Sequence, residues 1–322
     1  MTIKVVAQTI LVAASIAIIP ANLVGGAIQG QLGQSVHAAE IKNPQPEYGR
    51  IQNIPYLSAP SAAIYDYTAH SFVYSKQPFS WQYSASTSKL MAMYAIYRQM
   101  KAHPWLKWSS PVKIDYWGIS RMSVTPALGE TPLVLGRTYS AQQLAQNAMI
   151  LSSNESITAL GRWAFGSNQA MINAMNWNAR RLGLNQTRYY TTSGLDVADV
   201  ARFNLQLAGA PYYGRNTTSA YDLVMLAQAL FNEFPQILQL SSMSYEWVNG
   251  VRRYSTDHYL PFGAYYNPKH GIDGLKTGTT PAAGQVFVGT SVLPGHHRII
   301  TVVLHSRDRY ADTNRLVGAI GR

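Results

Sequence analysis

The pattern of apolar and polar positions changes twice along the chain, and each change predicts a different kind of secondary structure. Residues 61–77 contain two short apolar runs around a polar turn, which is typical of a β-hairpin. In the middle of the chain, apolar residues recur mostly every three or four positions, which predicts helices. Beyond residue 270, short Val- and Ile-rich runs separated by turn residues predict strands, and a final helix closes the chain.

Spacing and capping residues locate the individual elements. Leu90, Met93 and Tyr97 recur at helical spacing, and Ser140 and Ser219 are typical N-caps of two further helices. Prolines and glycines interrupt residues 101–138, which we expect to be irregular. The other predicted elements are helices at 155–165, 169–184 and 311–320 and strands at 271–280, 285–294 and 297–307.

This order of elements predicts an α/β fold of the α+β type. An antiparallel sheet is formed by the two ends of the chain and flanked by helices, while a mostly helical subdomain is inserted at roughly 98–270. Residues 59–322 then form the functional domain, with ample length for a buried core.

The N-terminal 38 residues are typical of an export signal. They carry one charge, Lys4, before an apolar stretch at 5–19, and small residues at Val36 and Ala38 fit cleavage after Ala38. An uncleaved membrane anchor is the alternative, although the stretch is shorter than the roughly 20 residues that span a bilayer. Residues 39–58 are polar and unpatterned, which predicts a linker.

Composition narrows the class of protein. With 47% hydrophobic and 13% charged residues, the chain is not predicted to be disordered. It has no cysteine, which excludes disulfides and thiolate chemistry, and an exported protein without cysteine is more typical of Gram-positive bacteria. The net charge of +11 is spread along the sequence rather than clustered. It therefore favours attraction to anionic cell-wall polymers over a nucleic-acid site.

Ser86 and Lys89 are the first candidates for chemistry. They form an S-x-x-K pattern where a helix is predicted to begin, so both side chains would lie on one face. A serine hydroxyl needs a nearby base to attack a carbonyl, and lysine serves if its pKa falls several units below about 10.4. The pattern alone is weak because Ser110 and Lys113 repeat it in an irregular stretch. An ordinary helix cap is the simpler explanation for Ser86.

Two further motifs strengthen the hypothesis. Ser152, Ser153 and Asn154 lie at the junction of two predicted helices, and Lys276-Thr277-Gly278 lies in a predicted strand. S-x-x-K, S-x-N and K-T-G in this order and at these intervals match the signature of the penicillin-recognising serine enzymes.

The surrounding sequence resembles one branch of these enzymes, the low-molecular-weight D-alanyl-D-alanine carboxypeptidases. "ASTSKLM", "MILSSNESITAL", "MNWNARRLGLNQTRYYTTSGLD" and "GIDGLKTGTTPAAG" carry the likeness, which covers roughly residues 59–320. Ser153 departs from the glycine that the family has in its second motif. No C-terminal β-domain or amphipathic anchor is expected after the last helix.

The resemblance implies a β-lactamase/transpeptidase-like fold and a set of roles. Ser86 is the nucleophile, Lys89 its base, and Ser152 and Asn154 complete the catalytic group. Lys276, Thr277, Gly278 and Thr279 bind the substrate, and the backbone amides of Ser86 and Thr279 form an oxyanion hole. The implied substrates are peptidoglycan stem peptides ending in D-Ala-D-Ala, with β-lactams as covalent inhibitors and no cofactor or metal.

Several alternatives remain open from the sequence. A transpeptidase or endopeptidase of the same superfamily shares the motifs, and an idle wall-binding or β-lactam-sensing protein is an alternative of another class. A class A β-lactamase would need a deacylating glutamate after the second motif, where no E-x-x-L-N pattern occurs. A Ser-His-Asp hydrolase lacks its G-x-S-x-G turn, and a zinc peptidase lacks H-E-x-x-H.

Overall fold

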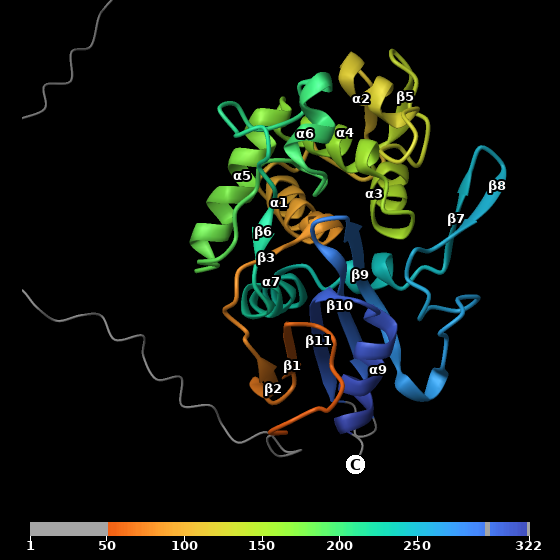
Figure 1. Ribbon diagram of the computed structural model, residues 1–322. Helices are drawn as coiled ribbons and strands as arrows, with labels where there is room; N and C mark the ends of the chain where they lie inside the picture. The colour runs from red at the N-terminus through yellow and green to blue at the C-terminus, as the bar shows by residue number, and fades with distance from the viewer. Residues whose placement is uncertain (1–50, 294–296, 321–322) are drawn as a thin grey trace, which may run out of the picture. The chain divides into compact units, whose positions relative to one another are not determined.

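The protein is described by a computed structural model that covers residues 51–293 and 297–320. Its central element is a five-stranded antiparallel sheet in the order β2-β1-β11-β10-β9 (Figure 1). The strands are β1 (Ser61–Asp66), β2 (Ser71–Lys76), β9 (Ile272–Thr280), β10 (Gly284–Val292) and β11 (Arg298–Ser306). Pairing of β1 with β11 joins the two ends of the described chain, so the middle is an insertion into the sheet's sequence.

Both faces of the sheet are buried, which explains why β11 reads as a nearly continuous apolar run. Ile299 and Val303 pack in the smaller apolar cluster together with α9 (Arg309–Ile320). Ile300 and Val302 point to the opposite face and join the main core, as the alternation of side chains along a strand requires. Helix α7 (Ala220–Glu233) also belongs to that core.

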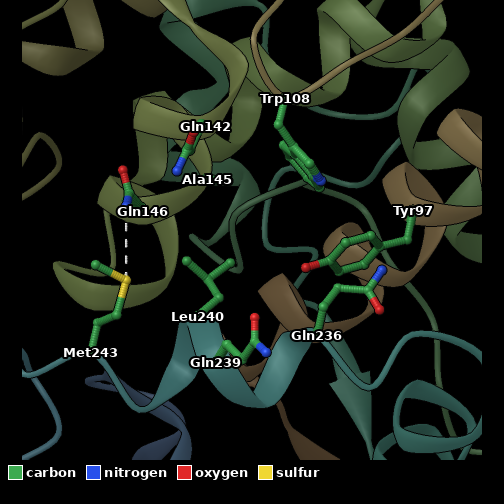
Figure 2. Close-up of a pocket in the computed structure, with 9 residues that line it drawn as sticks. All are labelled: Tyr97, Trp108, Gln142, Ala145, Gln146, Gln236, Gln239, Leu240 and Met243. Carbon is green, nitrogen blue, oxygen red and sulfur yellow. Dashed lines mark hydrogen bonds between the residues drawn. The ribbon is translucent and has the colours of Figure 1, made fainter.

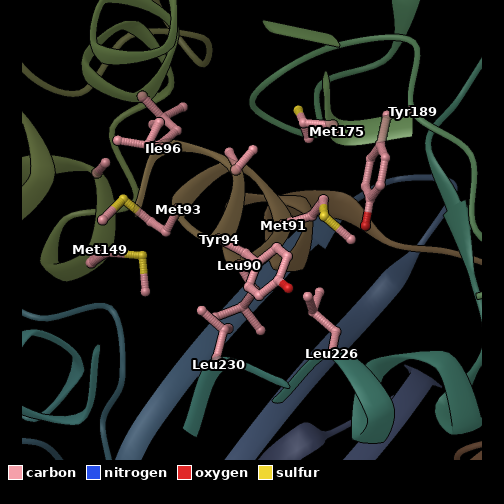
Figure 3. Packing of buried hydrophobic residues seen from close by; sticks show 14 of the residues in the cluster. Leu90, Met91, Met93, Tyr94, Ile96, Met149, Met175, Tyr189, Leu226 and Leu230 are labelled. Carbon is pink, nitrogen blue, oxygen red and sulfur yellow. The ribbon is translucent and has the colours of Figure 1, made fainter. Parts of the chain in front are cut away.

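Helix α1 (Ser88–Ala102) is the centre of the main core. Its first ten residues are all buried, and Figure 3 shows Leu90, Met91 and Met93 contributing to the packed apolar interior. Around it lie α3 (Ala141–Ile150), α4 (Asn154–Phe165) and α5 (Asn168–Arg181) (Figure 1). A helix that is apolar on all sides is held by its neighbours rather than by an amphipathic face, so α1 is a rigid support for the residues at its start.

Four helices begin after a serine whose side chain accepts a hydrogen bond from the backbone N–H three residues further on, and the sequence predicted two of these caps, Ser140 and Ser219. The capping residues are Ser140 for α3, Ser153 for α4, Ser167 for α5 and Ser219 for α7.

The remaining elements are short. The helices are α2 (Trp117–Ser123), α6 (Val197–Val200) and α8 (Ile237–Ser241), and the 3₁₀ turns are η1 (Ala85–Thr87), η2 (Ala201–Phe203) and η3 (Pro268–His270). Three small antiparallel pairs join β3 (Gln82–Tyr83) to β6 (Thr217–Thr218), β4 (Pro111–Lys113) to β5 (Thr138–Ser140), and β7 (Tyr245–Val248) to β8 (Val251–Tyr254).

The structure confirms the predicted α+β fold, including the 61–77 hairpin, the final helix and the three C-terminal strands. Several short elements were not predicted. Helix α2 and strand β4 lie within 101–138, a stretch expected to be irregular, and the β7–β8 hairpin turns through Asn249-Gly250, both at positive φ. Asn-Gly is a strong hairpin signal, so this hairpin could have been found from the sequence.

The predicted signal peptide at 1–38 lies outside the described residues, as does most of the expected linker at 39–58. The described part of that linker, residues 51–58, has no helix or strand, yet Ile54 and Leu57 are buried in the smaller apolar cluster. Among the described residues, no helix has the length and apolar character needed to span a bilayer.

Candidate active site

Ser86 and Lys89 lie side by side where α1 begins. Ser86 is in the 3₁₀ turn η1 rather than in the helix, and Lys89 is the second residue of α1. Lys89 Nζ is 2.8 Å from Ser86 Oγ, and the lysine side chain is fully buried. The structure therefore brings the predicted nucleophile and base into hydrogen-bond contact.

Two carbonyl oxygens hold the other side of the Lys89 amine. Nζ donates to Asn154 Oδ1 at 2.7 Å and to the backbone oxygen of Ser193 at 3.0 Å. Both partners can only accept, and a neutral amine has two N–H groups and one lone pair. With both N–H groups engaged, the lone pair is left for the hydroxyl hydrogen of Ser86, which is the arrangement that a general base requires.

The surroundings favour this neutral form. Burial lowers the pKa of Lys89 well below its usual value, and the positive charge of Lys276 lowers it further. Glu155 and Glu130 oppose this effect. Loss of hydration is thus the first cause and the second lysine the next.

Ser152, Ser153 and Asn154 divide their roles. Ser153 Oγ caps α4 by accepting from Ser156 N–H at 3.1 Å, so neither Ser152 nor Asn154 is the cap. Asn154 is the first residue of the helix and reaches Lys89. Ser152 has a left-handed backbone (φ 61°) and lines the same pocket as Ser86. Such strained positions cluster at functional sites.

The third motif forms one wall of this site along β9. Lys276 is buried rather than exposed to solvent, and its Nζ donates to the backbone oxygen of Thr277 at 3.0 Å. Burial lowers the pKa of Lys276 to about 7, with a further decrease from Arg309 and an opposing increase from Asp257. Its charge is therefore sensitive to pH near neutrality.

Gly278 brings β9 close to the nucleophile. A Cβ atom at this position would be 2.7 Å from Val286 Cγ2 and 2.9 Å from the backbone nitrogen of Ser86. The resemblance implied that Gly278 takes part in substrate binding. The structure shows that the missing side chain makes room for η1, so that β9 lies close to the Ser86 amide.

These residues surround one open pocket with a volume of about 500 Å³. Of the predicted site residues, Ser86, Ser152, Asn154, Thr277, Gly278 and Thr279 line it, whereas Lys89 and Lys276 lie beneath its surface.

Sequence reasoning missed three contributors. Arg309 lines the pocket and donates to the Thr279 hydroxyl and to Val286 O, but no motif marks it. Ser193 supplies the carbonyl for Lys89 and precedes the "GLD" element that carried part of the resemblance. Burial raises the pKa of Asp257 to about 6 beside Lys276 and Arg309.

Glu155 has a structural position. Its side chain is fully buried, and Oε1 accepts from Glu130 N–H at 3.0 Å and from the Thr131 hydroxyl at 2.7 Å. It does not line the pocket that contains Ser86. This placement gives no support to a class A β-lactamase, in which a glutamate activates water beside the acyl-enzyme.

The other serines of the opening motif also have structural contacts. Ser84 Oγ lies 2.7 Å from Ser88 Oγ, and Asn216 Nδ2 donates to Ser88 Oγ at 3.0 Å. No side chain caps either η1 or α1. The interpretation of this segment as a polar helix cap is therefore wrong.

The fold is shared with solved penicillin-binding proteins. The PBP3 peptidoglycan synthesis regulatory factor of Streptococcus pneumoniae aligns with a TM-score of 0.77 and 26% identity, covering 82% of this chain and 72% of that one. Penicillin-binding protein D2 of Listeria monocytogenes, in an ampicillin-bound form, aligns with a TM-score of 0.65 and 26% identity over 83% and 99%.

Sequence comparison gives the family. A profile of the D-alanyl-D-alanine carboxypeptidase family matches residues 49–308, and the chain belongs to this family. It is 30% identical over 241 residues to D-alanyl-D-alanine carboxypeptidase DacC of Escherichia coli K12, which is 72% of this chain and 54% of the relative. DacA of the same strain is 26% identical over 83% and 62%. The chain thus spans between 54% and 62% of the length of these relatives.

Proposed function

We propose that this protein is a serine-type D-Ala-D-Ala carboxypeptidase that removes the terminal D-alanine from peptidoglycan stem peptides. The observation that carries the proposal is the contact of Ser86 with a buried lysine whose amine also donates to two carbonyl oxygens. Membership of the D-alanyl-D-alanine carboxypeptidase family supports the choice of substrate.

Acylation begins when Lys89 accepts the Ser86 proton and Oγ attacks the carbonyl of the penultimate D-alanine. The carbonyl oxygen becomes negative and is stabilised by the backbone amides of Ser86 and Thr279. The close approach of β9 to Ser86 N supports this pairing. One such donor is worth about 3–4 kcal/mol in other hydrolases. Ser152 passes a proton to the leaving amine, D-alanine departs, and water then hydrolyses the ester on Ser86.

The terminal carboxylate of the substrate binds at the end of the pocket that contains Thr279. The structure favours Arg309 as the direct cation there because it lines the pocket beside Thr279, with the Thr277 hydroxyl on the same wall. Lys276 lies below and supplies positive charge to the pocket and to Lys89. Asn154 binds the substrate amide while it orients Lys89. Because the site attacks a D-alanyl carbonyl, β-lactams are proposed to acylate Ser86.

Similarity to an endopeptidase supports a second candidate activity. The chain is 28% identical over 272 residues to a D-alanyl-D-alanine endopeptidase of Escherichia coli K12, covering 81% of this chain and 77% of that protein. An endopeptidase cleaves the same kind of bond within a crosslink, and a transpeptidase gives the acyl group to an amine instead of water.

We further propose that the enzyme acts outside the cell, in the wall of a Gram-positive bacterium. The predicted export signal and the absence of cysteine support this location. Removal of residues 1–38 takes away one lysine, so the net charge becomes +11 − 1 = +10. This charge is suited to retention by anionic wall polymers.

Mass spectrometry after incubation with penicillin tests the proposal directly. We expect a covalent adduct on Ser86, D-alanine release from a peptide ending in D-Ala-D-Ala, and loss of both in Ser86→Ala. The matched control is Ser110→Ala, which changes the other S-x-x-K serine and should behave as wild type. An adduct that persists in Ser86→Ala overturns the assignment, and no adduct in the wild type favours an idle wall-binding protein. Adding an amine acceptor, or a crosslinked peptide, separates the three peptidase activities.

A further inference from the structure

A second pocket lies outside the active site, between α1, α3 and the α8 region (Figure 2). Its volume is about 360 Å³, within the range of ~300–1,000 Å³ typical of small-molecule sites. Nine residues line it, and none of them is charged: Tyr97, Trp108, Gln142, Ala145, Gln146, Gln236, Gln239, Leu240 and Met243. The site described above shares no residue with it.

The hydroxyl of Tyr97 is the feature that points to a ligand. The residue is only 5% exposed, and Figure 2 shows its oxygen directed into the space between Trp108 and Leu240. No hydrogen bond joins this oxygen to another described residue. Burial raises the pKa of Tyr97, so the group is a neutral phenol. The oxygen is not among the fully buried polar atoms, so it is open to the pocket and available to a bound molecule.

Amide groups surround this hydroxyl. Gln142 and Gln146 lie one helical turn apart on α3, while Gln236 and Gln239 approach from the opposite side (Figure 2). Gln146 makes only a weak 3.8 Å contact to the sulfur of Met243, and the other three amides donate to no described side chain. Each amide offers both a donor and an acceptor. Such groups match neighbouring hydroxyls on one ligand.

Aromatic and apolar surfaces complete the lining. Trp108 and Tyr97 meet edge to face with ring centroids 5.3 Å apart, and Leu240 lies near them. A purely apolar ligand would leave the amides and the phenol unpaired, and an anion would find no positive charge in the lining. The combination fits a neutral ring with apolar C–H faces and polar edges, which is a sugar.

We propose that this pocket binds a neutral N-acetylhexosamine, with the ring against Trp108, hydroxyls on the glutamines and Tyr97, and the acetamido methyl on Leu240. Helix α3 leads from Gln146 to Leu151 and Ser152, which line the active-site pocket. The sugar would come from the glycan strand that carries the stem peptides, and this assignment of its source rests on the proposed function.

Calorimetric titration with a soluble N-acetylglucosamine tetramer tests this site. The protein used is the full chain carrying Ser86→Ala, so that binding is measured in the absence of catalysis. We expect saturable binding, weakened about tenfold by Trp108→Ala and by Gln146→Ala. Gln143→Ala is the matched control, since Gln143 is on the same helix but does not line the pocket. It should bind as the parent does.

Tyr97→Phe distinguishes ligand binding from a structural role. It removes one oxygen that has no partner among the described residues, so the melting temperature should stay the same or rise while affinity falls several-fold. No saturable binding, or equal binding by the Trp108→Ala and Gln146→Ala variants, overturns the sugar site. Penicillin acylation of the corresponding variants with Ser86 intact shows that they fold. Because acylation is measured separately, absence of sugar binding would not contradict the proposed peptidase activity.

Discussion

The chain contains the S-x-x-K pattern twice, and the structure gives the two copies opposite environments. Lys89 is fully buried and bonded to Ser86, Asn154 and the Ser193 carbonyl. Lys113 is exposed on the short strand β4, and Ser110 Oγ accepts from the backbone nitrogen of Lys107 at 3.0 Å. The same four-residue pattern thus gives a hydrogen-bonded serine–lysine pair in one place and an ordinary surface turn in the other.

The difference shows where the chemistry comes from. A lysine in water keeps its proton at neutral pH, and only loss of hydration or a nearby cation makes it a base. At Lys89 both effects are present, because α1 is buried and Lys276 is close enough to lower its pKa. The second copy has no such surroundings, so its serine has no base.

The largest effect is expected when the lysine of each S-x-x-K copy is replaced by methionine in a separate variant. Lys89→Met removes the base while keeping an apolar chain of similar length, and penicillin acylation should slow on the order of 1,000-fold. Lys113→Met should change the rate less than about twofold, as expected for an exposed side chain away from the site. Stopped-flow acylation with a fluorescent penicillin measures both. Equal losses in the two variants would contradict the assignment of Lys89.

Asn154→Ala tests whether positioning makes the first copy reactive. It removes the acceptor that holds Lys89 Nζ at 2.7 Å while keeping both members of the pair. Acylation should fall on the order of 100-fold through misplacement of the base. Asn176→Ala serves as the control, since Asn176 bonds backbone groups of Ile172 and Tyr189 instead. If the Asn154 variant keeps its rate, the neutral-amine arrangement is not needed.

The pH profile of kcat/KM tests the role of the second lysine. The pKa of Lys276 is about 7, so its charge is lost as pH rises through this value and activity should decline on the alkaline side. Lys276→Arg keeps the charge at high pH and should move this decline upward. Asp257→Asn removes the anion that raises the pKa of Lys276, so the decline should move downward. If kcat/KM declined at the same alkaline pH in the wild type and both variants, the role of the Lys276 charge would be contradicted.

Gly278→Ala gives the smallest expected effect and tests the backbone around Ser86. The added methyl meets Val286 and the Ser86 amide, so β9 or η1 must shift and acylation should slow about tenfold. Gly318→Ala is the matched control for Gly278→Ala. Gly318 lies on α9, and no atom lies within 4 Å of the methyl group that the substitution adds. This control should keep full activity and raise the melting temperature slightly, since glycine costs helices about 1 kcal/mol.

Much of the fold followed from local patterns. The hairpin, the serine caps of α3 and α7 and the Val- and Ile-rich strands were predicted because spacing and capping depend on neighbouring residues. Helix α2 was missed because its surroundings are rich in proline and glycine, and its packing overrides that local preference.

The sequence by itself determined the residue types that the site needs, since serine, lysine and asparagine carry the required functional groups and the three motifs occur in order. The other two motifs already favoured the first S-x-x-K copy, but only the tertiary structure gives Lys89 its buried surroundings and adds Arg309 and the Ser193 carbonyl. The reason is physical: a pKa depends on burial and on charges within a few ångströms. Residues 65 and 104 positions from Lys89 become its neighbours only when the helical insertion folds against the sheet.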